Sequence, residues 1–289
     1  MTERSTTDGS APDNPAPNPP DNPASGKSAA DAPTLELVGV VKSFGAVHAL
    51  SSVNFTARAG EVTALVGDNG AGKTTLIKCI GGIHRLDAGE FRFEGKPVEV
   101  HGPRDATALD IAIVYQDLAL CDNLDIVQNM FLGREPTSRA RTLDENTMER
   151  LAKEALASLS VRTVQSVRQT VASLSGGQRQ TIAIAKSVLW KSKVVILDEP
   201  TAALGVAQTE QVLTLVRRLA DQGVAVVLVS HNMNDVLQVA DNIGVLYLGR
   251  MAAQVRRKNV TQTQIVELIT AGRSGDLGLT PEESTGAAV

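Results

Sequence analysis

The run from Gly67 to Thr74, Gly-Asp-Asn-Gly-Ala-Gly-Lys-Thr, constrains this chain more than any other stretch. It fits the pattern G-x-x-x-x-G-K-[ST], in which glycines let the backbone turn tightly and direct several N–H groups at one anion. An apolar run at 62–66 precedes it and residues 75–80 suit a helix, which is the strand and helix context of a phosphate-binding loop. We therefore predict a nucleoside triphosphate site, in which the Lys73 ammonium reaches the terminal phosphates and the Thr74 hydroxyl binds Mg²⁺.

The composition of the 289 residues is that of an ordinary globular protein, with 43% hydrophobic and 21% charged residues. The net charge of −4 gives no reason to expect nucleic acid or an anionic lipid surface as the main partner. Two cysteines, Cys79 and Cys121, imply no disulfide framework and favour the cytosol. No apolar run approaches the roughly 18 residues that a membrane-spanning helix needs, and no apolar segment near the N-terminus indicates a secretory signal. We therefore expect a cytosolic protein without a membrane span of its own.

Composition also divides the chain. Residues 1–33 are rich in Pro, Asn, Asp and Ser, so burial cannot offset the entropy of ordering them, and we predict a disordered tail. Residues 273–289 are again small and polar, which predicts a loose C-terminal tail and places the folded part at 34–272. Within it, the stretch 118–185 lacks strand patterns. Apolar residues at helical spacing over 143–159 predict an amphipathic helix there, so we expect an inserted helical subdomain.

The remaining patterns predict two kinds of sheet. Alternating apolar residues indicate half-buried strands, including a hairpin, in an antiparallel sheet beside the nucleotide site. Continuous apolar runs indicate parallel strands buried on both faces, and residues 208–220 suit a helix that covers them. We therefore predict an α/β fold: a P-loop NTPase core with a mainly parallel sheet, an antiparallel β subdomain and an inserted α-helical subdomain. The alternating segments are 35–38, 50–55, 90–94 and 98–100, and the continuous runs are 111–115, 194–197 and 224–229.

Two further stretches carry candidate chemistry. The run 194–197 ends in Asp198 and Glu199, and in such sheets the strand ends face the ligand crevice. Asp198 is placed to bind Mg²⁺ and Glu199 to orient or deprotonate an attacking water, although two acids after a strand can also be plain strand-end solvation. The second stretch is Leu-Ser-Gly-Gly-Gln at 174–178. Its Ser175 and two glycines precede a helical pattern and form a second anion-binding helix N-terminus.

On this last stretch the chain resembles the ATP-binding cassettes of ABC transporters, in which Leu-Ser-Gly-Gly-Gln is the signature motif. The resemblance covers about 35–270 and implies a head-to-tail homodimer, with two ATP molecules held between the phosphate loop of one copy and the signature of the other. It assigns adenine stacking to Phe44, contacts with Mg²⁺, water and the membrane partner to Gln116, and contact with the γ-phosphate to His231. The expected nucleotide contacts are Phe44, Gly67, Asp68, Asn69, Gly70, Ala71, Gly72, Lys73, Thr74, Thr75, Ser175, Gly176, Gly177 and Gln178, the expected Mg²⁺ ligands are Thr74, Gln116 and Asp198, and the expected catalytic residues are Glu199, His231 and Gln116.

The segments 117–124 and 129–136 look like those of bacterial carbohydrate importers of the ribose, xylose and fructose type. After Ala202-Ala203-Leu204 the chain has Gly205, where the family usually has an aspartate in a loop that communicates between the two sites, so the resemblance does not extend to tight coupling between them. It implies an ATPase subunit at the cytoplasmic face of the inner membrane, with a separate permease and, indirectly, an extracytoplasmic solute-binding protein. The alternatives are a cytosolic ABC ATPase outside transport, an importer of another small solute, and a small-molecule kinase, which would leave the signature unused.

Overall fold

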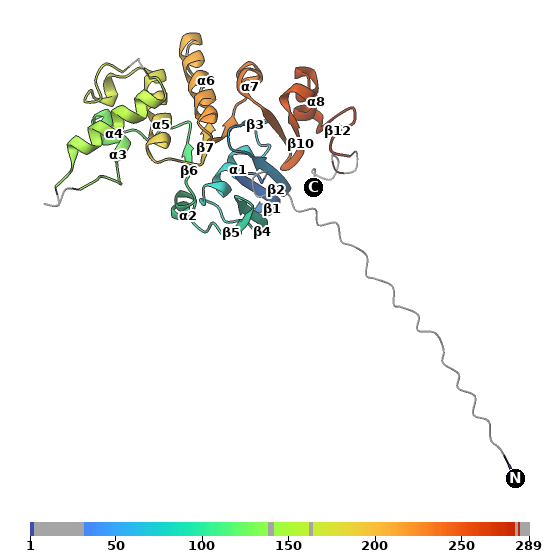
Figure 1. Cartoon of the computed structure of the whole chain (residues 1–289). Coiled ribbons are helices and arrows are strands. Elements are labelled where there is room, and N and C mark those ends of the chain that lie inside the picture. Colours follow the sequence, from blue (N-terminus) through green and yellow to red (C-terminus); the bar gives the residue numbers. More distant parts are fainter. Residues whose placement is uncertain (3–31, 138–141, 162–163, 281–282, 284–289) are drawn as a thin grey trace.

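The computed structural model describes residues 1–2, 32–137, 142–161, 164–280 and 283, so the N-terminal tail predicted over 1–33 lies almost wholly outside the described residues. A six-stranded sheet in the order β10-β9-β3-β8-β7-β6 forms the centre of the molecule (Figure 1). Its neighbouring strands are parallel, except that β10 runs antiparallel to β9. The strands are β3 (Val62–Gly67), β6 (Ile111–Val114), β7 (Val194–Asp198), β8 (Ala225–Val229), β9 (Asn242–Tyr247) and β10 (Arg250–Arg256).

The inner strands of this sheet are buried on both faces, as their continuous apolar runs predict. Val195 and Leu197 of β7 pack in one hydrophobic cluster with α6 (Val206–Asp221), whereas Val194 and Ile196 pack in a second cluster with α1 (Lys73–Ile80). Alternate side chains of one strand thus enter different cores, because successive residues of a strand point to opposite faces. The predicted α/β core and the covering helix are confirmed.

A four-stranded antiparallel sheet in the order β2-β1-β4-β5 covers the α1 side of the centre (Figure 1). Its strands are β1 (Leu35–Phe44), β2 (Val47–Ala57), β4 (Ala88–Phe93) and β5 (Lys96–Val98). The predicted hairpin forms, with Phe93 opposite Lys96. β1 and β2 run further than their alternating segments, because the register shifts in their ladder interrupt the alternation without ending the pairing.

Helices fill the stretch between β6 and β7, where the sequence predicts a helical subdomain, and gather at one end of the molecule (Figure 1). The amphipathic helix expected over 143–159 is α4, and α5 extends past residue 185, the predicted end of the subdomain. Among the described residues, no helix combines the length and apolar character needed to cross a membrane. The helices here are α3 (Ile126–Phe131), α4 (Glu145–Ser158) and α5 (Gly176–Leu189), and elsewhere α2 (Pro103–Ala108), α7 (Met233–Val239) and α8 (Gln262–Ala271).

The C-terminal part of the structure differs from the sequence prediction in two places. β9 and β10 complete the central sheet, and neither was predicted. The tail expected to be loose from residue 273 instead begins with a short antiparallel pair, β11 (Arg273–Ser274) and β12 (Leu277–Gly278). Gly272 and Gly278 adopt positive φ, and an added Cβ at Gly278 would lie 2.3 Å from the Gly272 carbonyl oxygen. The glycines therefore allow the chain to fold back tightly. A composition of small residues does not by itself indicate this turn.

Candidate active site

The loop between β3 and α1 has the backbone geometry that its glycines predict. Gly67, Gly70 and Gly72 all have positive φ, at 154°, 82° and 105°. A Cβ at Gly67 would lie 2.4 Å from the Leu246 carbonyl oxygen, and one at Gly72 would lie 2.7 Å from that of Ala49. Both clashes involve backbone atoms, so only glycine fits. The loop is therefore wedged between β2 and the end of β9, with its N–H groups at the start of α1.

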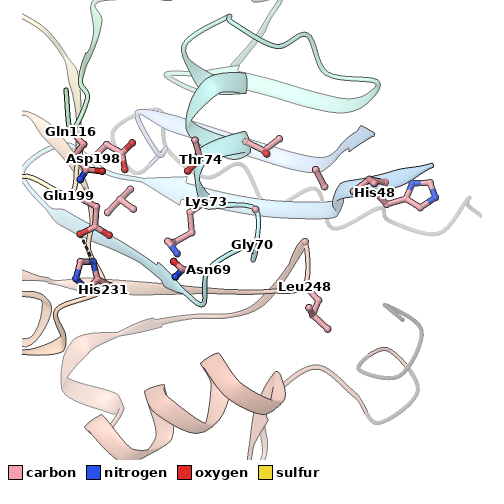
Figure 2. Close-up of a pocket in the computed structure, with 16 residues that line it drawn as sticks. His48, Asn69, Gly70, Lys73, Thr74, Gln116, Asp198, Glu199, His231 and Leu248 are labelled. Carbon is pink, nitrogen blue, oxygen red and sulfur yellow. Dashed lines mark ion pairs between the residues drawn. The ribbon is translucent and has the colours of Figure 1, made fainter. Parts of the chain in front are cut away.

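This loop forms the floor of a cavity of about 510 Å³ (Figure 2). Gln116 comes to it from just beyond β6, Asp198 and Glu199 from the end of β7, and His231 from just beyond β8. These side chains meet because parallel strands present their carboxyl ends at one edge of the sheet. The lining residues are Val47, His48, Ala49, Asn69, Gly70, Gly72, Lys73, Thr74, Thr75, Gln116, Asp198, Glu199, Val229, His231, Leu248 and Gly249.

Lys73 occupies the centre of the site. Its Nζ donates hydrogen bonds to the carbonyl oxygens of Gly67, at 2.7 Å, and Asp68, at 3.0 Å. Burial lowers the pKa of the Lys73 ammonium, and the nearby carboxylates of Glu199, Asp68 and Asp198 oppose that shift. The ammonium is thus held by two neutral carbonyls close to the mouth of the loop, where an anionic phosphate would be a stronger partner.

Glu199 and His231 form the second feature of the site. Oε2 of Glu199 lies 2.8 Å from Nδ1 of His231, while the Glu199 side chain is 15% exposed and that of His231 is 72% exposed. Glu199 has a φ of 50°, a left-handed conformation that costs a non-glycine residue about 1–2 kcal/mol. Its N–H donates to the carbonyl oxygen of Val229 at 3.0 Å, which ties it to β8. The rest of the structure thus holds a strained backbone that aims this carboxylate at the cavity.

The residues present fit a bound Mg²⁺. The Thr74 hydroxyl, the Gln116 amide and the Asp198 carboxylate all face the cavity and supply oxygen ligands. Mg²⁺ in proteins is commonly bound by one or two carboxylates together with substrate phosphates and water. Burial, and next the charge of Glu199, raises the pKa of Asp198, whereas Lys73 lowers it. A partly desolvated carboxylate beside a second acid is a group that a cation would stabilise.

Some of the predicted nucleotide contacts lie outside the cavity lining. Phe44 is the clearest case: it ends β1 opposite Val47, is 45% exposed, and packs edge-on against the ring of His84 at 5.0 Å. Val47, His48 and Ala49 reach the cavity from this hairpin, whereas Phe44 does not. Gly67, Asp68 and Ala71 likewise do not line it and shape the loop from behind. Adenine stacking on Phe44 stays a prediction.

The predicted signature is also absent from the cavity lining and forms the start of α5. Ser175 is the N-cap residue, whose hydroxyl accepts from the N–H of Gln178 at 3.4 Å, and the Gln178 side chain accepts from the N–H of Ser175 at 2.9 Å. A Cβ at Gly177 would lie 3.0 Å from Cβ of Gln208, so Gly177 lets α5 approach α6 closely. The capped helix N-terminus expected from the sequence is present, and it lies away from the cavity of its own chain.

The part of the cavity that the β9–β10 turn and the β1–β2 hairpin form was not predicted from the sequence. The N–H of Gly249 donates to the Ala71 carbonyl oxygen at 3.0 Å, and the Gly249 carbonyl oxygen accepts from Ser51 at 2.7 Å, so this turn joins the phosphate loop to β2. His48 lies at this edge of the cavity, and its Nδ1 pairs with the Ser43 hydroxyl at 2.9 Å. Recognising β9 and β10 as strands would have placed their turn here. The residues missed are Val47, His48, Ala49, Val229, Leu248 and Gly249.

Solved ATP-binding cassettes share this fold. A nucleotide-free ATP-binding cassette from an ABC transporter matches with a TM-score of 0.72 at 25% identity, covering 82% of this chain and 98% of that one. A dimeric cassette in a post-hydrolysis state, bound to ADP and Pi, matches with a TM-score of 0.64 at 24% identity, covering 77% of this chain and 98% of that one. The fold is therefore that of an ATP-binding cassette.

The chain belongs to the ABC transporter family, which matches residues 50–202. It is 43% identical to the fructose import ATP-binding protein of Rhizobium meliloti, over 84% of this chain and 96% of that relative. It is also 43% identical to the xylose/arabinose import ATP-binding protein of Sulfolobus acidocaldarius, over 85% of this chain and 97% of that relative. The family and the carbohydrate-importer branch expected from the sequence are confirmed.

Proposed function

We propose that this protein binds ATP with Mg²⁺ and hydrolyses it as the ATP-binding subunit of a transporter that imports a sugar. The observation that carries the hydrolytic part is the Glu199–His231 pair, at 2.8 Å, in the same cavity as Lys73. The assignment of a sugar as the imported solute rests on the relatives, which are named for fructose and for xylose/arabinose import. The residues of this cavity do not identify the sugar, because the permease would select the solute that is transported.

Each group at the cavity has a role in this proposal. Lys73 exchanges its carbonyl partners for phosphate oxygens, and the N–H groups at the start of α1 face the same anion. Glu199 orients or deprotonates the attacking water, while His231 contacts the γ-phosphate. Positioning and charge neutralisation dominate phosphoryl transfer, so such an arrangement supplies most of what the reaction needs. Thr74, Asp198 and the Gln116 side chain would hold Mg²⁺, which would supply further positive charge at the phosphates.

The proposed active form is a homodimer docked on a separate membrane permease at the cytoplasmic face of the membrane. A dimeric cassette among the structural neighbours supports the pairing. The placement of Ser175 at a capped helix N-terminus, outside its own cavity, also fits a role toward the nucleotide of a second copy. The relatives are import proteins, which supports a permease and, through it, an extracytoplasmic solute-binding protein.

The decisive variant is Glu199→Gln, which removes the carboxylate base while keeping a side chain of nearly the same size. We expect ATP affinity close to that of the wild type and a kcat lower by about 10²–10⁴-fold, the usual contribution of a positioned acid or base. Glu154→Gln is the matched control, because Glu154 pairs with Arg150 at the same 2.8 Å but on the exposed surface of α4. Turnover in purified protein is measured as phosphate release, and affinity by equilibrium binding of a fluorescent ATP analogue.

Wild-type turnover in Glu199→Gln would remove Glu199 from this role. Uptake of labelled fructose, xylose and ribose is then compared in cells that carry either the wild-type protein or the Glu199→Gln variant. Loss of uptake of one sugar in the variant would identify the cargo. Unchanged uptake of all three sugars, with hydrolysis abolished, would count against sugar import and favour another solute or a role outside transport.

A further inference from the structure

A buried carboxylate that the proposed chemistry does not use lies just behind the active site. Asp235 is 4% exposed and belongs to the first turn of α7, which follows His231 along the chain. Its Oδ2 accepts a 2.6 Å hydrogen bond from the hydroxyl of Thr201. A buried acid is costly unless it is well hydrogen-bonded, so this contact has a strong energetic reason to persist.

Thr201 belongs to the loop 199–205, which begins with the proposed catalytic carboxylate. Within this loop the N–H of Ala202 donates to the carbonyl oxygen of Glu199 at 3.1 Å, and the N–H of Leu204 donates to the carbonyl oxygen of Thr201 at 3.2 Å. These consecutive turns make the loop a stiff unit, whose start is the strained backbone of Glu199. A movement of Thr201 would therefore be transmitted to Glu199.

The same loop reaches the predicted signature at its other end. A Cβ built on Gly176 would lie 3.3 Å from Cδ2 of Leu204, so the two residues pack directly against each other. The loop thus contacts the start of α5 and carries Glu199. The Asp235 bond joins it to α7, the helix that follows His231. Glu199 lies two residues before Thr201, and His231 lies four residues before Asp235, so each member of the Glu199–His231 pair is close in sequence to one partner of the Thr201–Asp235 bond.

We propose that Asp235 is a positioning residue for the reaction, acting through its hydrogen bond to Thr201. This bond fixes the loop 199–205 against the start of α7 and so sets the distance between Glu199 and His231. It also sets where Leu204 meets Gly176. Asp235 does not line the cavity, so it would act only through Thr201. The inference rests on the proposed ATP hydrolysis, because that reaction is what the positioning serves.

The test compares variants that keep or remove the bond. Thr201→Ser keeps the hydroxyl and should retain kcat within about twofold. Thr201→Val has nearly the same shape without the hydroxyl. We expect it to lower kcat on the order of ten- to a hundredfold, since small misplacements of catalytic groups have effects of that size. Its KM for ATP and its affinity for a fluorescent ATP analogue should stay within about threefold of wild type, because neither residue lines the cavity.

A double variant separates positioning from stability. Thr201→Val leaves the Asp235 carboxylate buried without its hydroxyl partner and so also lowers Tm, whereas Thr201→Val with Asp235→Leu removes both polar groups and should recover Tm. We expect kcat to stay low in the double variant. Recovery of kcat together with Tm, or wild-type kcat in Thr201→Val alone, would overturn the inference. Wild-type protein that hydrolyses no ATP would instead contradict the proposed function.

Discussion

Replacing Gly205 by aspartate should stabilise the protein, because residue 205 is the N-cap of α6. Gly205 has extended backbone angles, φ −74° and ψ 163°, and offers no side-chain acceptor to the first turn of the helix. A Cβ there would meet nothing within 4 Å, so a side chain fits. As an N-cap residue, aspartate stabilises a helix by a few tenths of a kcal/mol more than glycine does, and its charge adds about 0.3–1 kcal/mol of stability at a helix N-terminus. We expect a total gain of about 0.5–1 kcal/mol, or roughly 1–4 °C in Tm for a domain of this size.

Differential scanning calorimetry of nucleotide-free protein checks this value against two controls. Gly205→Ala adds a Cβ without an acceptor and should melt below wild type, while Gly205→Asn caps without charge and should fall between wild type and aspartate. Equal Tm values for the aspartate and alanine variants would refute the capping argument. The same variants show whether an aspartate alters the dependence of turnover on ATP concentration, as expected if this residue couples two sites.

Two further predictions concern Gly177 and Asp198. Gly177→Val should lower Tm by several degrees, because overpacking costs about 1–3 kcal/mol, and Cβ and Cγ of Gln208 would lie 3.0 Å and 3.1 Å from the added Cβ. Gln208→Ala in the same chain removes Cγ but keeps Cβ, so it should recover part of the loss; no recovery would count against crowding as the cause. Asp198→Asn should raise Tm without nucleotide at pH 7–8 while weakening binding of Mg·ATP. Burial raises the pKa of Asp198 in the folded state, so ionisation destabilises the fold as pH rises from the unfolded-state pKa, about 4, through the raised folded-state pKa. The gain in Tm should therefore vanish near or below about pH 4. A gain in Tm independent of pH would contradict this reasoning.

The central fold was predictable because its signals are local and strong. Continuous apolar runs mark β7 and β8, whose alternate side chains enter two different cores, and the glycines of the phosphate loop identify the turn between β3 and α1. β9 and β10 were missed although they complete the same sheet. β10 is half-exposed and joins the sheet as its antiparallel edge strand, so its sequence reads as neither a buried run nor a clean alternation.

The site was predictable to the extent that strand ends determine it. Asp198, Glu199 and His231 follow buried parallel strands, and topology alone brings such positions to one edge. Leu248 comes instead from the β9–β10 turn and His48 from the start of β2, and the position of both depends on how the two sheets pack, which no local pattern encodes. The Thr201–Asp235 bond joins residues 34 positions apart and has the same origin. Sequence thus identifies groups that act directly on a ligand, whereas groups that position them become visible only when packing shows what each one touches.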